Sequence, residues 1–173
     1  MPSLVIRPRQ DSDLEQAGQA LADVHATDGY PVEGVADPVD WLKPAGLLNA
    51  WIAELDGQIV GHVAVSEPHP GDDAARLWME QSDDTAQDIA VLGRLFVKRS
   101  ARGRSIGEQL ARAAVTATAR QNKRMVLDVM EKDQDAIRLY ERLGLKRIGV
   151  ATHHFGEGQE TTAICYLVPT ITM

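Results

Sequence analysis

The sequence has 173 residues, a formal net charge of −7 and 44% hydrophobic residues, a composition typical of an ordinary globular protein with one domain over residues 1–173. No apolar run approaches the roughly 20 residues that cross a bilayer, and with Cys165 as the single cysteine there is neither an internal disulfide nor a cysteine zinc cluster. We therefore expect a cytoplasmic protein that binds no membrane and no metal, and the net acidity argues against nucleic acid as its partner.

The first forty residues predict one strand and two helices. Residues 4–8 read as a short strand, and Ser12 with Glu15 has the spacing of a capping box that begins a helix of about three turns. Asp37 followed by Pro38 is the start signal of a second, short helix, with the aspartate as its cap.

The middle of the chain contains its clearest hairpin. Residues 50–55 and 58–65 read as strands on either side of Asp56 and Gly57, a dipeptide that favours a two-residue turn. A third helix is expected over residues 72–81.

The remaining elements alternate between strands and helices. Residues 89–97 contain few polar side chains, as expected of a central strand, and a helix follows from Ile106. The later elements are a strand over 125–130, a helix from Asp133 to Leu143 closed by Gly144, and strands over 146–155 and 161–168. This order predicts an α/β fold, with helices on the faces of a mixed sheet.

A basic segment stands out in the acidic chain. Five positive charges follow Asp88 with no acidic residue before Glu108, namely Arg94, Lys98, Arg99, Arg102 and Arg104. The start of a helix offers backbone N–H groups that lack intrahelical partners, and its dipole is positive there. A strand, a basic turn and a helix start therefore predict a site for a specific anion.

Two motifs carry a family resemblance. The basic turn reads Arg102-Gly103-Arg104-Ser105-Ile106-Gly107, and residues 127–145 read LDVMEKDQDAIRLYERLGL. In this order the two resemble the acyl-CoA pyrophosphate loop and the following strand and helix of the Gcn5-related N-acetyltransferase (GNAT) superfamily. The resemblance implies a mostly antiparallel central sheet of about seven strands with helices on both faces, and residues 70–87 would be a helical insertion.

The resemblance implies a binding role for acetyl-CoA, as a co-substrate, in both motifs. The residues implied are Leu95, Phe96, Val97, Arg102, Gly103, Arg104, Ser105, Ile106, Gly107 and Asp133. Two of them depart from the family pattern. Ser105 replaces the first motif glycine, and we expect its hydroxyl either to face the phosphate or to cap the helix. Asp133 stands where many members carry asparagine, and an ionised aspartate has no donor.

Tyr140 is the implied general acid that protonates the leaving thiolate of coenzyme A. The alternative from the residues alone is a core tyrosine. The general base stays open, and its candidates are Glu33, Asp37, Glu80, Asp88, Asp128, His153 and His154. Cys165 lies in a terminal strand and is interpreted as a packing residue.

The resemblance predicts an N-acetyltransferase that transfers acetyl from acetyl-CoA to a primary amine, of a small molecule or a protein, by direct attack in a ternary complex. The amine would meet residues 25–42, which are acidic, and residues 153–159. The alternative is a non-catalytic sensor or regulatory domain that binds acyl-CoA, and a nucleic-acid module is a weaker third reading. The segment at 70–87 would border the substrate cleft or form a homodimer through Trp78 and Met79.

Overall fold

The computed structural model describes residues 3–32 and 34–169. Contacts divide the chain into two compact units, residues 1–65 with 94–114 and residues 66–93 with 115–173. Strand β4 (Ile89–Val97) and helix α4 (Ile106–Arg120) each belong partly to both units. Whether the chain acts as a single domain stays a prediction. No helix among the described residues is long and apolar enough to cross a membrane.

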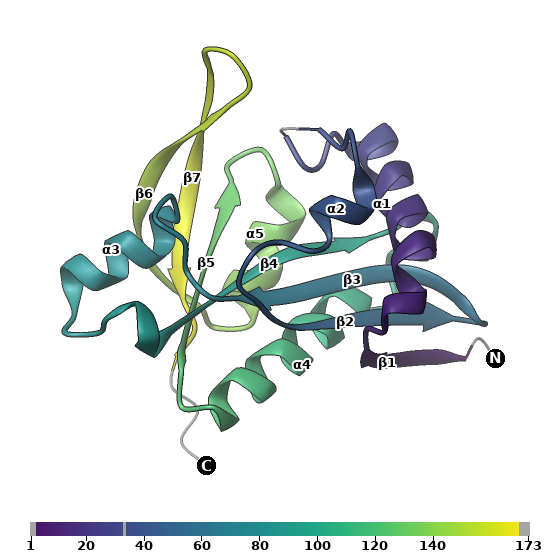
Figure 1. Ribbon diagram of the computed structural model, residues 1–173, viewed down its shortest axis with the longest axis horizontal. Helices are drawn as coiled ribbons and strands as arrows, with labels where there is room; N and C mark the ends of the chain where they lie inside the picture. Colours follow the sequence, from purple (N-terminus) through teal and green to yellow (C-terminus); the bar gives the residue numbers. More distant parts are fainter. Residues whose placement is uncertain (1–2, 33, 170–173) are drawn as a thin grey trace. The chain divides into compact units, whose positions relative to one another are not determined.

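Seven strands form one mixed sheet in the order β1-β2-β3-β4-β5-β7-β6 (Figure 1). Strands β1–β2, β5–β7 and β6–β7 pair antiparallel, whereas β4 and β5 pair parallel. This confirms the expected mixed, mostly antiparallel sheet. The other strands are β1 (Leu4–Pro8), β2 (Leu47–Leu55), β3 (Gln58–Ser66), β5 (Arg124–Met130), β6 (Lys146–Phe155) and β7 (Gln159–Leu167).

The core of the first unit forms where helices α1 (Leu14–Asp28) and α2 (Pro38–Trp41) pack on strands β2 and β3. Apolar side chains that recur at helical spacing in α1, including Leu21, join Ile52, Ile59 and Phe96 in one buried cluster. Burial of each large apolar side chain contributes about 2 kcal/mol, which holds the end of β4 against α1.

The start of α1 differs from the expected capping box of Ser12 and Glu15. A short 3-10 turn (Asp11–Asp13) comes first, and the Asp13 carboxylate accepts the Gln10 N–H at 2.7 Å. Arg7 of β1 also donates to Asp13 at 2.8 Å, and this bond is the main reason that the pKa of Asp13 is lowered. A partner from β1 therefore decides the helix start at Leu14, which local spacing could not indicate.

The hairpin turn is the one that the sequence predicts. Asp56 and Gly57 both have positive φ angles, 52° and 82°, as a type I′ turn requires. Only residues that tolerate the left-handed region fit both positions, which is why this dipeptide was a strong signal.

The second unit contains helices α3 (Asp73–Gln81) and α5 (Gln134–Arg142), and α3 packs on β5, β6 and β7. Its core includes Cys165, which is fully buried, and burial raises the pKa of the thiol to about 12. The thiol is thus an inert packing group. Met79 is exposed, whereas Trp78 packs against this core and donates to Asp84 at 2.7 Å, so a dimer through this pair stays a prediction.

Candidate active site

Strand β4 changes its backbone direction at Arg94, which has a φ of 51° in the left-handed region. Its ladder with β5 pairs Ile89–Val91 with Arg124–Val126, and β4 then continues to Val97. A non-glycine residue at positive φ costs about 1–2 kcal/mol. Two contacts with Trp41 hold the Arg94 side chain, because its Nε donates to the Trp41 carbonyl at 2.9 Å and its guanidinium lies 4.7 Å from the centre of the Trp41 ring.

His62 of β3 holds the Arg94 carbonyl from inside the first unit. Its Nδ1 donates to that carbonyl at 2.9 Å, so Nε2 is left to accept from Nη1 of Arg9 at 3.0 Å. Burial is the main reason that the pKa of His62 is lowered to about 4; the bond to the Arg94 carbonyl opposes this, and the charges of Arg9 and Arg94 add to it. The ring stacks on Phe96 at 5.4 Å between centroids. A neutral, fully buried imidazole therefore fixes the backbone next to the expected binding strand.

The three β4 residues expected at acetyl-CoA are Leu95, Phe96 and Val97. Phe96 is buried, with 4% of its surface exposed. The Val97 carbonyl accepts from the Arg102 guanidinium at 3.2 and 3.1 Å. The carbonyl of Phe96 passes so close to Gly61 that a Cβ there would meet its oxygen at 3.1 Å. The end of β4 is thus positioned by Arg102 and by the close approach of Gly61.

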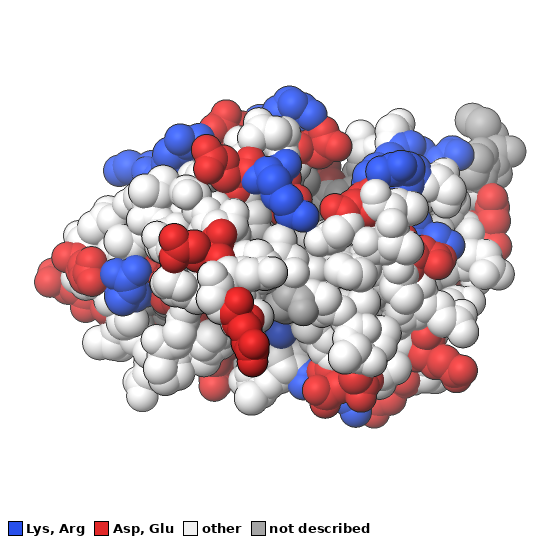
Figure 2. All heavy atoms as spheres, turned by 90° about the horizontal axis from the view of Figure 1, so that it is seen from above, with Lys and Arg blue, Asp and Glu red and all other residues white. Residues whose placement is uncertain are grey.

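The basic turn contacts acidic residues near the end of α1. Asp28 accepts from Arg99 at 3.0 Å and also pairs with Arg102. These bonds lower the pKa of Asp28, because they outweigh the opposing effect of its burial, which is the largest single cause. On the face drawn in Figure 2, basic and acidic side chains are interspersed rather than separated. Asp28 therefore offsets part of the positive charge of Arg99 and Arg102.

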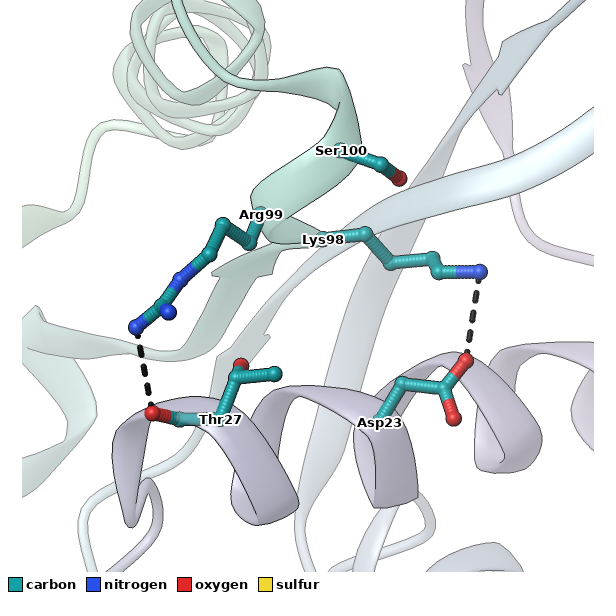
Figure 3. A pocket seen from close by; sticks show the side chains of 5 residues that line it. All are labelled: Asp23, Thr27, Lys98, Arg99 and Ser100. Carbon is teal, nitrogen blue, oxygen red and sulfur yellow. Dashed lines mark hydrogen bonds and ion pairs between the residues drawn. The ribbon is translucent and has the colours of Figure 1, made fainter.

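A pocket of about 360 Å³ lies between α1 and residues 98–100, which follow β4. Figure 3 shows Lys98 and Arg99 reaching toward the helix, where Lys98 pairs with Asp23 at 3.2 Å and Arg99 donates to the Thr27 carbonyl at 3.1 Å. Ser100 completes its lining. The charges around this pocket are therefore paired with one another.

Helix α4 begins directly after Ser105, whose carbonyl accepts from the Gln109 N–H at 3.1 Å. Ser105 has a φ of 60° and Gly103 a φ of 82°, whereas an ordinary serine cap is extended. Ser105 therefore has a left-handed backbone, which glycine adopts without strain, and the role of its hydroxyl stays a prediction. Arg104 is exposed, Ile106 is buried, and the N–H groups of Ile106 and Gly107 lie in the first turn.

Tyr140 lies in α5 of the second unit with 5% of its surface exposed. Its ring packs against that of Tyr166, with 6.1 Å between the centroids. Burial raises the pKa of Tyr140, and the charges of Asp128 and Asp133 raise it further. The phenol is therefore protonated at neutral pH and can donate. Asp133 lies directly before α5, and its carbonyl accepts the Ile137 N–H at 3.1 Å.

The structure separates the candidate bases. Asp128 of β5 and His153 of β6 lie together with Asp73 of α3, and the ligand atoms of the three lie within 4.8 Å of one another. Burial raises the pKa of the Asp128 carboxyl. Asp73 was not a candidate, because its sequence position shows only a helix start.

The other candidates have structural partners or lie elsewhere. Asp37 caps α2 by accepting the Asp40 N–H at 3.0 Å, and Asp88 accepts the Thr85 N–H at 2.8 Å. Glu80 pairs with Arg76 and His154 with Glu160 on the surface, while Glu33 lies outside the described residues.

Comparison with known proteins gives the family and fold. The model of the acetyltransferase (GNAT) family matches residues 18–145. An N-acetyltransferase from Staphylococcus aureus Mu50 has a similar fold, with a TM-score of 0.69, 16% identity and coverage of 95% of this chain and 96% of that one. Arabidopsis thaliana NAA60 in complex with acetyl-CoA gives a TM-score of 0.71 at 18% identity, covering 95% and 97%. A ribosomal-protein-alanine N-acetyltransferase from Brucella melitensis gives 0.72 at 18% identity, covering 94% and 98%.

Proposed function

Because this chain belongs to the acetyltransferase (GNAT) family and is an acyltransferase, we propose that it transfers acetyl from acetyl-CoA to a primary amine by direct attack in a ternary complex. No covalent acyl-enzyme is needed, since Cys165 is buried and its thiol stays protonated. The amine attacks the thioester carbonyl, the C–S bond breaks, and the thiolate of coenzyme A takes a proton.

The start of α4 supports binding of the coenzyme A pyrophosphate. N–H groups in the first turn of a helix lack intrahelical partners and attract phosphate oxygens. The left-handed residues Gly103 and Ser105 turn the chain sharply before this helix. Arg102 and Arg104 would add charge-assisted hydrogen bonds to the phosphates. The complex of NAA60 with acetyl-CoA supports the choice of ligand.

Tyr140 is the observation that carries the proposal of catalysis. Its ring is buried in α5 of the second unit, and its hydroxyl is a proton donor. With its raised pKa, the group keeps its proton at neutral pH and can give it to the departing thiolate. The nitrogen of the product amide then returns a proton to the site.

The alternative is a sensor that binds acyl-CoA without turnover. Ser105 and Asp133 favour it, because each departs from the family pattern at a position expected to bind the cofactor. The Tyr140 hydroxyl, whose pKa burial raises so that it keeps its proton at neutral pH, favours the enzyme.

The deciding experiment measures coenzyme A release from acetyl-CoA with a panel of primary amines. We expect at least one amine to be turned over, and Tyr140→Phe to lower kcat by about 100-fold at an unchanged Kd for acetyl-CoA. Tyr166→Phe is the matched control, because it removes a hydroxyl that already pairs with Glu141 and Arg147. Tight acetyl-CoA binding without release for any amine would identify the sensor instead.

A further inference from the structure

The first residue of the basic turn, Arg102, has two partners within the first unit. Its Nη2 donates to Oδ2 of Asp28, the last residue of α1. Its Nε and Nη2 also donate to the Val97 carbonyl, at 3.2 and 3.1 Å. Both N–H bonds of Nη2 therefore have acceptors, and the guanidinium joins the end of α1 to the end of β4.

The Asp28 carboxylate is held in place at the end of its helix. Its side chain is 19% exposed, and Oδ1 accepts from Arg99 at 3.0 Å while Oδ2 accepts from Arg102. The helix ends directly after it, because Gly29 has a φ of 70° and its N–H donates to the His25 carbonyl at 2.9 Å. A carboxylate at this position lies at the negative end of the helix dipole. The two guanidinium groups therefore offset a charge that the helix itself disfavours.

Asp28 uses the same donors of Arg102 that a phosphate would use. An arginine binds carboxylate and phosphate oxygens through the same N–H groups and with similar geometry. Arg102 lies four residues before the start of α4, whose first turn is the expected site of the pyrophosphate. Because Nη2 cannot donate the same hydrogen to both anions, and because the two anions repel each other, a phosphate that binds Arg102 has to replace Asp28.

We propose that Asp28 forms an autoinhibitory contact, in which its carboxylate competes with the pyrophosphate of coenzyme A for Arg102 and is released when the cofactor binds. The identity of this ligand rests on the proposed acetyl transfer. The exchange breaks the hydrogen bond from Arg102 to Asp28 and forms one from Arg102 to a phosphate oxygen, while Arg99 keeps its bond to Asp28. Binding of the cofactor thereby loosens the end of α1, directly before the residues that lead to α2.

Competition for Arg102 makes the stability of the fold and the affinity for the cofactor change in opposite directions. Removal of the Asp28 charge weakens bonds that support the fold, but it leaves the Arg102 guanidinium available to phosphate. If Asp28 only held Arg102 in the correct position for the ligand, its removal would weaken cofactor binding. The sign of the change in affinity therefore separates an autoinhibitory contact from a structural one.

The test measures the Kd of acetyl-CoA by calorimetry for wild type, Asp28→Asn and the matched control Asp23→Asn. Asp23 lies earlier in the same helix and pairs with Lys98 at 3.2 Å, so its substitution removes the same charge without touching Arg102 (Figure 3). We expect Asp28→Asn to bind acetyl-CoA about five- to ten-fold more tightly than wild type, and Asp23→Asn to stay within about two-fold. In an Arg102→Gln background, Asp28→Asn should change the Kd by less than about two-fold. An unchanged or weaker affinity of Asp28→Asn, or an equal gain in Asp23→Asn, would overturn the proposal.

A spectroscopic measurement on the wild-type protein keeps this inference separate from acetyl transfer. Saturation with acetyl-CoA or with inorganic pyrophosphate should move the ¹³C NMR signal of the Asp28 carboxylate toward its position in Arg102→Gln, where the bond to Arg102 is absent. If acetyl-CoA binds to no variant, but pyrophosphate moves this signal and binds more tightly to Asp28→Asn, the proposed acetyl transfer fails while the autoinhibitory contact stands. If neither ligand moves the Asp28 signal, the contact is structural and the proposal is wrong.

Discussion

Acidification should destabilise this protein through His62. The imidazole is fully buried and neutral, with its two nitrogens fixed between the Arg94 carbonyl and the Arg9 guanidinium. Protonation would place a hydrogen on Nε2, directly against the positive charge of Arg9. His62 therefore binds a proton less readily in the folded protein than in the unfolded chain.

The sign and size of this effect follow from the two pKa values. The pKa of His62 is about 4 in the folded protein and 6.5 when the ring is solvated. Between these values the unfolded state binds more protons, so stability is complete above pH 6.5 and falls as the pH drops toward 4. At roughly 1.4 kcal/mol per pH unit, the full loss is about 3 kcal/mol, which is a large part of a typical folding free energy.

Urea denaturation at a series of pH values between 7 and 4 measures this loss. Carboxylates also titrate in this range, so His62→Gln provides the comparison, because an amide keeps a donor and an acceptor but does not titrate. The variant can be less stable at every pH, but its stability should fall by about 3 kcal/mol less than that of wild type over this interval. Parallel curves for the two proteins would refute the reasoning.

Three further changes test the backbone around the turn. Ser105→Gly should raise Tm by about 1–3 °C while Ser105→Ala does not, because only glycine relieves the strain of the positive φ. The affinity for acetyl-CoA should change by less than about three-fold in Ser105→Gly, and a loss of affinity by orders of magnitude would contradict this. Gly61→Ala should cost about 1–2 kcal/mol in thermal unfolding, since its Cβ would press on the Phe96 carbonyl at 3.1 Å, and an unchanged Tm would show that the strand moves freely. Asp28→Asn should cost about 1–2 kcal/mol in urea unfolding at pH 7 by weakening two guanidinium bonds, whereas Asp135→Asn, at an exposed position, should be neutral.

The sequence predicts most of the fold because the strongest signals here are local. Asp56 and Gly57 specify a turn that few other residues can make, and Gly144 with a φ of 83° ends α5. The apolar run at residues 89–97 matches β4 to the residue. Such patterns depend on neighbours along the chain, which a sequence displays directly.

What the sequence does not predict depends on partners far along the chain. Arg7 donates a hydrogen bond to Asp13, directly before α1, and Asp28 pairs with Arg102, which lies 74 residues away in the sequence. The meeting of Asp73 with Asp128 and His153 requires α3 to pack on β5 and β6, a contact without a local signature. The left-handed φ of Arg94 cannot be predicted from the sequence either, because an apolar strand contains no local signal for such a backbone conformation.

The division of the chain has a consequence for how the protein is made. The first unit consists of residues 1–65 and 94–114, so it is not a continuous piece of polypeptide. During synthesis its core cannot be completed until Phe96 has been added to the chain. Until then, Ile52 and Ile59 keep part of their apolar surface exposed to water. A fragment that ends at residue 65 should therefore aggregate. A fragment that ends at residue 114 contains the whole first unit, but its residues 66–93 belong to the second unit and lack the partners that residues 115–173 supply.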